Sequence, residues 1–333
     1  MIVVDNGSGD STADVARSFA RKLPLRLFSE ARPGIPRCRN RCLREARNRV
    51  LAFTDDDCKV PPDWIQRIAT YHEAYPGAAA IGGPVVNGAP GLLGETNQRM
   101  WESWLCAYRE APKSGTSDIR FRTPARIPHV LKRPAQVRSL FTANCSYKVV
   151  SIRRIGGFNE SLLTMSDEEL NWRLCNSGER LLYIPDMPVV HAHRGAIASF
   201  IEQHFRYGIG FYQTRTLHPG MPGILPRSTL VSVWMFPILA LTQALFNAGV
   251  ARLSCKTLPL AVLMWIAETA FRTGALYAGT GHRRAVFLPA PQPAPSRTSA
   301  PSAHSHSMAA SPKGDTEKTL SCIAPGPTSR GKL

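Results

Sequence analysis

Three adjacent carboxylates follow an apolar run in this chain, in the stretch "FTDDDC" at residues 53–58. Adjacent negative charges repel one another, and a bound divalent cation would remove that repulsion. Mg²⁺ and Mn²⁺ prefer oxygen ligands such as carboxylates and phosphates. Because alternate side chains of a strand point to one face, Asp55 and Asp57 can serve a single ion, while Asp56 bonds backbone amides or a sugar hydroxyl. An exposed acidic turn is the alternative that these residues leave open.

The charge of the chain indicates what kind of partner it has. The formal net charge is +17 over 333 residues, which favours anionic partners such as nucleic acid, nucleotide diphosphates or an acidic membrane surface. Arginines are dense over residues 32–49, directly before the acidic triplet, and this suggests a metal and a phosphate bound together. A solvated helix face is the alternative. The basic run contains no interleaved aromatic residues and no nucleic-acid-binding motif, so nucleic acid is not expected as a partner. The eight cysteines show no zinc-ligand spacing.

Short β-branched runs alternate with helical periodicity over about the first 210 residues. The first strand, at residues 2–4, ends at Asp5 in a turn cluster, and a second apolar strand covers residues 50–54. Strands that alternate with helices predict right-handed crossovers and a mostly parallel, Rossmann-like sheet flanked by helices. Ligands of such sheets bind beyond the carboxyl ends of the strands, so Asp5 and the acidic triplet are expected to face one crevice.

The chain changes character after residue 215. Residues 228–251 contain no charged side chain and no histidine, and this length suffices for a transmembrane helix, which needs about 20 residues. A second apolar stretch, 258–278, contains Glu268 and Arg272, so it can span a membrane or lie in the interface as an amphipathic helix. Two buried helices of a soluble protein are the alternative. We predict an α/β domain at 1–215, a membrane-associated apolar helical hairpin at 216–280, and a disordered Pro/Ser/Ala-rich tail at 281–333.

Six motifs occur in order along the predicted α/β domain. They are "VVDNGSGDST" at 3–12, "GIPRCRN" at 34–40, "FTDDDCKVPPDW" at 53–64, "IGGFNE" at 155–160, "SDEELNWRLCNSG" at 166–178 and "YIPDMPVVHAHR" at 183–194. Together they resemble the successive motifs of the family 2 glycosyltransferases, which have the GT-A fold. Six motifs in order are far more specific than a lone acidic triplet. The resemblance implies the transfer of a sugar from a nucleotide-diphosphate sugar to an acceptor.

The resemblance also implies roles for the residues that would bind the donor. Asp5 matches the family aspartate that hydrogen-bonds the nucleotide base. Arg37, Arg39 and Asn40 fall where the family has basic and amide groups beside the nucleotide, and a planar guanidinium suits phosphate.

Asp55 and Asp57 match the metal-binding DxD element of the family, in which Mg²⁺ or Mn²⁺ bridges the diphosphate. His191 follows the last predicted strand, where the family often has a histidine near the metal. A structural role for His191, and for the neighbouring His193, is the alternative. Residues 203–207 are similar to the glutamine-x-x-arginine-tryptophan motif of processive members, with tyrosine in place of tryptophan.

The family places a catalytic base in a Glu-Asp pair at a helix start. The aligned pair here is Ser166-Asp167, so Asp167 is predicted to deprotonate the acceptor hydroxyl. Glu168 or Glu169 could substitute if the register differs. Favourable placement of negative charge at a helix N-terminus is the structural alternative, worth roughly 0.3–1 kcal/mol per charge.

The largest departure from the family lies at the amino terminus. Family members begin with a strand and a helix that precede the first strand of this chain. That strand would lie near the centre of the sheet, so its loss is expected to expose hydrogen-bonding edges. The two explanations are an upstream start codon and a degraded copy.

We therefore expect a metal-dependent, inverting glycosyltransferase that acts at the cytoplasmic face of a membrane. Its acceptor would be a polysaccharide, a lipid-linked glycan or a related molecule. Inversion is expected because the motifs supply one base and no second nucleophile. The alternative is a catalytically inactive, membrane-attached protein that binds a nucleotide sugar or another partner.

Overall fold

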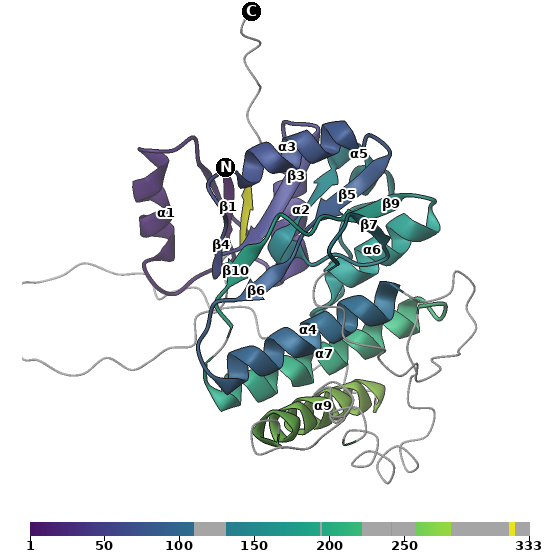
Figure 1. Ribbon diagram of the computed structural model, residues 1–333. Coiled ribbons are helices and arrows are strands. Elements are labelled where there is room, and N and C mark those ends of the chain that lie inside the picture. The colour runs from purple at the N-terminus through teal and green to yellow at the C-terminus, as the bar shows by residue number, and fades with distance from the viewer. Residues whose placement is uncertain (110–130, 194, 222–240, 242–257, 281–319, 324–333) are drawn as a thin grey trace, which may run out of the picture.

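The computed structural model describes residues 1–109, 131–193, 195–221, 241, 258–280 and 320–323 (Figure 1). Eight of the described strands form one sheet, and three form a second. In spatial order the large sheet contains β2 (Arg26–Ser29), β1 (Ile2–Asp5), β11 (Leu320–Ile323), β3 (Val50–Asp55), β8 (Cys145–Lys148), β5 (Ala78–Gly82), β9 (Arg180–Tyr183) and β7 (Ala135–Val137). The small sheet contains β4 (Cys58–Lys59), β10 (Val189–His191) and β6 (Val85–Asn87).

The helices flank the large sheet or form a separate layer beside it (Figure 1). Those around the sheet are α1 (Thr12–Ala20), α2 (Ile35–Glu45), α3 (Trp64–Ala74), α5 (Val149–Arg154) and α6 (Ser166–Asn176). The separate layer consists of α4 (Leu92–Arg109), α7 (Ile197–Leu217) and α9 (Leu258–Gly279). A short 3₁₀ helix, η1 (Thr142–Asn144), leads into β8.

The sheet is mixed, so the prediction of a mostly parallel sheet is wrong. β1 pairs with β2 in parallel, as β5 does with β9, whereas β8 runs antiparallel to both β3 and β5. The register explains the reversal: Cys145, the first residue of β8, lies opposite Phe53 near the carboxyl end of β3. The chain thus enters β8 from the edge of the sheet at which β3 ends, so β8 runs in the direction opposite to β3.

The strand β11 fills the position between β1 and β3. It is antiparallel to both, with Leu320 opposite Val4 on one side and Asp55 on the other. The sequence led us to expect exposed hydrogen-bonding edges near this point and a disordered tail at 281–333. The described part of that tail is this strand, and it covers the inner edges of both neighbours.

Different helices pack on the two faces of the large sheet. Helices α2, α5 and α6 pack on one face, with a core that includes Cys42, Ile152 and Leu174. Helix α3 packs on the other face through Trp64 and Ile68. Cys38 and Cys42, four positions apart on α2, are thus buried as their helical spacing predicts, whereas α1 buries none of its residues.

An aromatic trio anchors the end of β3 that leads to the acidic triplet. The rings of Phe53, Tyr147 and Phe158 pack edge-to-face, with centroids 5.5, 6.0 and 6.4 Å apart. Such pairs add about 0.5–1.5 kcal/mol each beyond the burial of area. Phe53 is fully buried and stands two residues before Asp55, so this packing fixes where the strand ends.

The predicted apolar hairpin is not confirmed. Its first half, residues 228–251, lies outside the described residues except for Leu241. Its second half forms α9, which packs against α7 at a close crossing of Gly208 and Gly274. Within the parts of the chain that the structure describes, no helix is both long and apolar enough to cross a membrane.

Candidate active site

The carboxyl ends of β1 and β3 carry the first two groups of the candidate site. Asp5 ends β1, and one of its carboxylate oxygens accepts a hydrogen bond from the amide of Ser8 at 3.0 Å. Asn6 fixes the loop before α2, because its side chain donates to the carbonyl of Glu30 at 2.8 Å and accepts from the amide of Gly34 at 2.8 Å. The backbone around Asp5 is therefore held by the loop that leads to α2, the helix that carries Arg37, Arg39 and Asn40.

The acidic triplet meets His191 in the small sheet. After β3 the chain turns at Asp56 and Asp57 into β4, whose Cys58 lies directly opposite His191 of β10. The Oδ1 atom of Asp57 is 3.1 Å from Nε2 of His191. Ligand atoms of Asp57, Cys58 and His191 all lie within 4.8 Å of one another. A carboxylate, a thiol and an imidazole this close form a donor set that a divalent cation fits.

The structure thus brings together two of the three predicted metal ligands and adds a residue that the sequence did not suggest. Asp55 belongs to the same strand end but not to this cluster, and Asp56 is exposed. The added residue is Cys58, which no spacing rule selects, because its partner His191 is distant in the sequence. Burial, followed by the charge of Asp55, raises the pKa of the Cys58 thiol to about 12.

Aromatic rings surround the histidine side of the cluster. The indole of Trp101 lies 5.0 Å from the ring of His191, 4.9 Å from that of His193 and 5.3 Å from that of Phe141, measured between centroids. His191 and His193 are both buried. Trp101 comes from α4, and the sequence motifs did not assign it to the site. It restrains the two histidines from the side of the helical layer.

Asp167 is held at the same edge through η1. Its Oδ2 atom accepts hydrogen bonds from the hydroxyl of Thr142 at 3.1 Å and from the amide of Thr142 at 3.3 Å. Because Cys145 pairs with Phe53, η1 lies just beyond the end of β3. Met165, the residue before α6, has a φ of 60°, a left-handed conformation that is uncommon for a residue other than glycine. That turn sets the start of α6, one residue before Asp167.

The neighbouring carboxylates of α6 are engaged in ion pairs. Glu168 pairs with the buried Arg215 of α7, at 2.7 Å, and Glu169 makes two short contacts with Arg173, at 2.7 and 2.8 Å. Asp167 instead accepts only neutral hydrogen bonds among the contacts described above. The three neighbouring carboxylates of α6 therefore have different surroundings.

The predicted donor-binding residues of α2 contact other parts of the domain. Arg39 is buried and donates to the hydroxyls of Ser166, at 2.8 Å, and Thr142. Arg37 pairs with Glu160 at 2.7 Å. Asn40 holds the loop of the "IGGFNE" motif, because it donates to the carbonyl of Phe158 and accepts from its amide, both at 2.8 Å. Arg39 therefore connects α2 to the threonine that holds Asp167.

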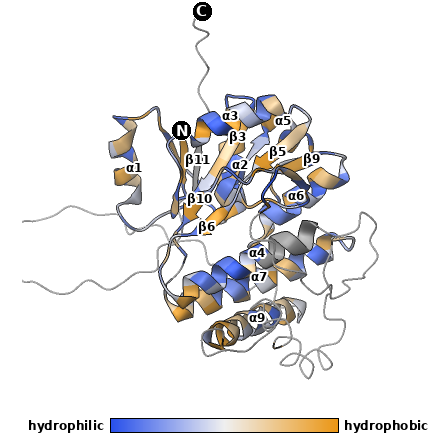
Figure 2. Ribbon diagram, in the orientation of Figure 1, coloured by the Kyte–Doolittle hydropathy of each residue, from blue (hydrophilic) through white to orange (hydrophobic). Residues whose placement is uncertain are grey.

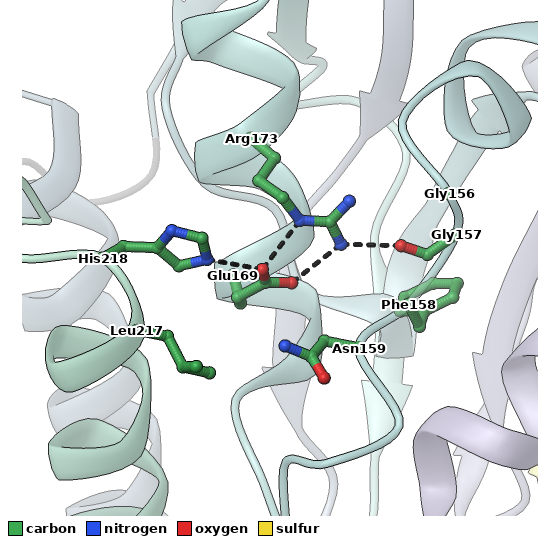
Figure 3. Close-up of a pocket in the computed structure, with 8 residues that line it drawn as sticks. All are labelled: Gly156, Gly157, Phe158, Asn159, Glu169, Arg173, Leu217 and His218. Carbon is green, nitrogen blue, oxygen red and sulfur yellow. Dashed lines mark hydrogen bonds and ion pairs between the residues drawn. The ribbon is translucent and has the colours of Figure 1, made fainter.

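A separate pocket lies on the other side of α6. Figure 3 shows Glu169 between Arg173 and His218, whose Nε2 atom is 2.7 Å from the Glu169 carboxylate. The pocket has a volume of about 320 Å³ and is also lined by Gly156, Gly157, Phe158, Asn159 and Leu217. Residues two apart on a helix differ by about 200° in direction, so Glu169 points away from the side of Asp167. We call the sheet edge that carries Asp5, Asp57 and Asp167 the acidic edge. The pocket and the acidic edge are therefore different places on the domain.

The residues 203–207 make contacts within their own helix. The side-chain amide of Gln203 donates to the Tyr207 hydroxyl at 2.8 Å, and Nδ1 of His204 lies 2.9 Å from the Phe200 carbonyl. Burial lowers the pKa of His204 to about 4. These contacts stabilise the helical layer, and they give no separate indication of an acceptor site.

The fold and the acidic edge define an α/β domain of the GT-A type. The structure resembles that of a mannosyltransferase from Pyrobaculum calidifontis in complex with GDP-mannose and Mn²⁺, with a TM-score of 0.50 and 19% identity, over 82% of this chain and 76% of that one. Residues 1–129 match the model of glycosyl transferase family 2. This first part of the chain is therefore similar to the family 2 glycosyltransferases.

Two relatives are similar over most of the chain. The succinoglycan biosynthesis protein ExoA of Rhizobium meliloti is 25% identical, over 67% of this chain and 63% of its own length. The glycosyltransferase AglE of Haloferax volcanii is 23% identical, over 83% of this chain and 84% of its own length. The chain therefore spans less than two thirds of the length of ExoA.

Proposed function

We propose that this chain is a metal-dependent, inverting glycosyltransferase that moves a sugar from a nucleotide-diphosphate sugar to a polysaccharide, a lipid-linked glycan or a related acceptor. The observation that carries the proposal is the position of Asp167. Thr142 holds this carboxylate just beyond the end of β3, the strand that leads into Asp55 and Asp57. A base and a metal site at one edge of the sheet are the two groups that such a transfer needs.

Each residue has a specific part in this proposal. Asp5 would hydrogen-bond the base of the nucleotide. Asp57 and His191 would hold Mg²⁺ or Mn²⁺, which when bound stabilises the negative charge of the leaving diphosphate. Asp167 would take the proton of the acceptor hydroxyl. Arg39 would keep Asp167 in place through Thr142, because it donates to that hydroxyl.

The test of the proposal measures nucleoside diphosphate release from a panel of donor sugars, with Mn²⁺ or Mg²⁺ present. We expect Asp167→Asn to lower turnover by about 10²–10⁴-fold, the usual contribution of a positioned base, and to leave donor binding intact. The matched control is Asp14→Asn, which changes an exposed carboxylate on α1. Loss of donor binding in Asp167→Asn, without a fall in turnover of bound donor, would assign the residue a structural role.

An inactive binding protein remains the second candidate. It is favoured by the position of β11, which lies at the centre of the sheet between the strands that carry Asp5 and Asp55. The same panel separates the two functions. Donor binding by calorimetry without release of nucleoside diphosphate from any donor would support the binding protein.

We also propose that the helical layer rests on an anionic membrane surface. The three helices share a core at their amino-terminal halves, which includes Met100, Phe200 and Met264. Large apolar side chains are exposed on these same halves: Leu92, Ile197, Ile201, Leu258, Val262 and Trp265. Figure 2 shows apolar residues at this end of the layer. The uncharged segment 228–251 precedes α9 in the sequence, and the net charge of +17 suits anionic lipid.

Flotation with vesicles tests this surface. We expect the protein to float with vesicles that contain phosphatidylglycerol, and Val262→Glu combined with Trp265→Glu to reduce the bound fraction severalfold. The matched control is Val150→Glu on α5, where the native side chain is 68% exposed. An equal fall in the bound fraction of the control, or no flotation of the native chain, would refute the proposal that the helical layer binds the membrane.

A further inference from the structure

We propose that Cys58 is itself a ligand of the metal ion, so that this site binds thiophilic cations such as Zn²⁺ and Co²⁺ more tightly than Mg²⁺. The proposal takes from the proposed function only the location of the site. It concerns the chemical nature of the donor set, and it holds whether or not the chain transfers sugar.

The backbone places the thiol and the imidazole on one face. Cys58 and His191 are direct partners in the antiparallel ladder of β4 and β10, and directly paired residues point to the same side of a sheet. The amide of Ala192 donates to the carbonyl of Asp57 at 2.9 Å, which continues the pairing into the turn. The three candidate ligands are therefore fixed by main-chain hydrogen bonds as well as by their side chains.

The surroundings of His191 restrain its ring further. The strand β10 is the middle strand of the small sheet, and the carbonyl of His191 accepts from the amide of Gly88 at 2.9 Å. The rings of Trp101 and His193 pack against the imidazole. A histidine with a 3% exposed side chain and aromatic neighbours has little freedom to turn away from Asp57 and Cys58.

The donor set decides which ions the site prefers. Mg²⁺ favours six oxygen ligands, whereas a thiolate and an imidazole suit Zn²⁺ and other later transition ions. Zinc sites with an open position commonly use three protein ligands, the number found here. When the ion binds sulfur, the S–H bond breaks, the metal–sulfur bond forms, and the proton leaves to solvent. Because Mg²⁺ gains little from sulfur, Cys58 should separate the two classes of ion.

The alternative is that Cys58 is a small apolar side chain of the core. It packs partly against the cluster around Trp64 and Ile68, and a structural cysteine would do the same. In that case removal of the sulfur would change protein stability but not the choice of ion.

The first experiment titrates the metal-free full-length chain with Co²⁺ and records near-ultraviolet absorption. We expect a sulfur-to-cobalt charge-transfer band that is absent in Cys58→Ser and present in Cys175→Ser, a matched change of another free, half-buried cysteine. Competition with a chelating dye should show Zn²⁺ affinity lowered by about 100-fold or more in Cys58→Ser, beyond the roughly 10–100-fold cost of losing an outer-shell partner. The affinity for Mg²⁺ should change little.

A second measurement does not depend on the folding of a variant. X-ray absorption of the Zn²⁺-loaded native protein should show one sulfur at about 2.3 Å. A zinc shell of nitrogen and oxygen alone, a cobalt band that persists in Cys58→Ser, or no band in the native protein would overturn the proposal. None of these readouts needs turnover, so failure of the transferase assay leaves them interpretable.

Discussion

The buried ion pair between α6 and α7 gives the sharpest prediction of stability. Arg215 and Glu168 meet at 2.7 and 3.3 Å, their side chains are 3% and 10% exposed, and the guanidinium also lies 3.9 Å from the centroid of the Phe211 ring. Arg215→Met keeps most of the volume but leaves the carboxylate of Glu168 buried and uncompensated. Removal of one partner of a buried pair typically costs about 3–5 kcal/mol.

The size of the effect can be measured by urea denaturation and by thermal melting. A loss of about 3–5 kcal/mol corresponds to a fall in Tm of roughly 6–20 °C, at about 2–4 °C per kcal/mol for a domain of this size. The matched control is Arg206→Met, which removes the ion-pair partner of the exposed Glu202, 3.6 Å away on the same helix. Exposed pairs at this spacing contribute only about 0.3–0.5 kcal/mol.

A double variant tests the reasoning itself. If the cost of Arg215→Met comes from the unpaired carboxylate, then Glu168→Leu together with Arg215→Met should recover much of the loss, because two apolar side chains leave no buried charge. A single variant that loses less than about 1 kcal/mol would refute the argument. So would a double variant no more stable than the single one.

Two further predictions concern His72 on α3 and Gly83 directly after β5. Burial, with a smaller contribution from Lys148, lowers the pKa of His72 to about 4, below its ordinary 6.5, so the unfolded chain binds the proton first. Stability should therefore fall as pH drops from about 6.5 to 4, by roughly 3 kcal/mol at most, and His72→Gln should flatten this part of a pH series of urea melts. A Cβ on Gly83 would lie 2.3 Å from the carbonyl oxygen of Met187, whereas one on Gly9 would meet nothing within 4 Å. Gly83→Ala should cost about 1–3 kcal/mol and Gly9→Ala almost nothing, and equal costs in urea would contradict this account.

The helices and strands could be predicted from the local sequence, but the order and direction of the strands in the sheet could not. The period of four over Cys38 and Cys42 predicts a buried helix face, and α2 has it. In α1, Val15 and Phe19 have the same spacing and are exposed, because no described element covers them. The antiparallel run of β8 depends on the pairing of Phe53 with Cys145, and no local pattern encodes a pairing between such distant residues.

The same limit applies to the candidate site. Asp57 and His191 belong to separate motifs, and the resemblance placed them together before the structure did. Cys58 was missed because ligand spacing is a local signal, whereas β4 and β10 bring this residue to its partner across the small sheet. The burial of Arg39 follows from contacts with Thr142 and Ser166, more than 100 positions further along the chain.

The position of β11 has a consequence for how the protein is made. The ribosome synthesises β1 and β3 long before residues 320–323, yet among the described strands it is this late one that pairs with both. Until β11 arrives, no ladder of the described strands links the pair β1–β2, with Asp5, to the strand that leads to Asp57. Contacts between distant parts of a chain form slowly. The two halves of the acidic edge are therefore brought into register late, after translation has passed every other described element.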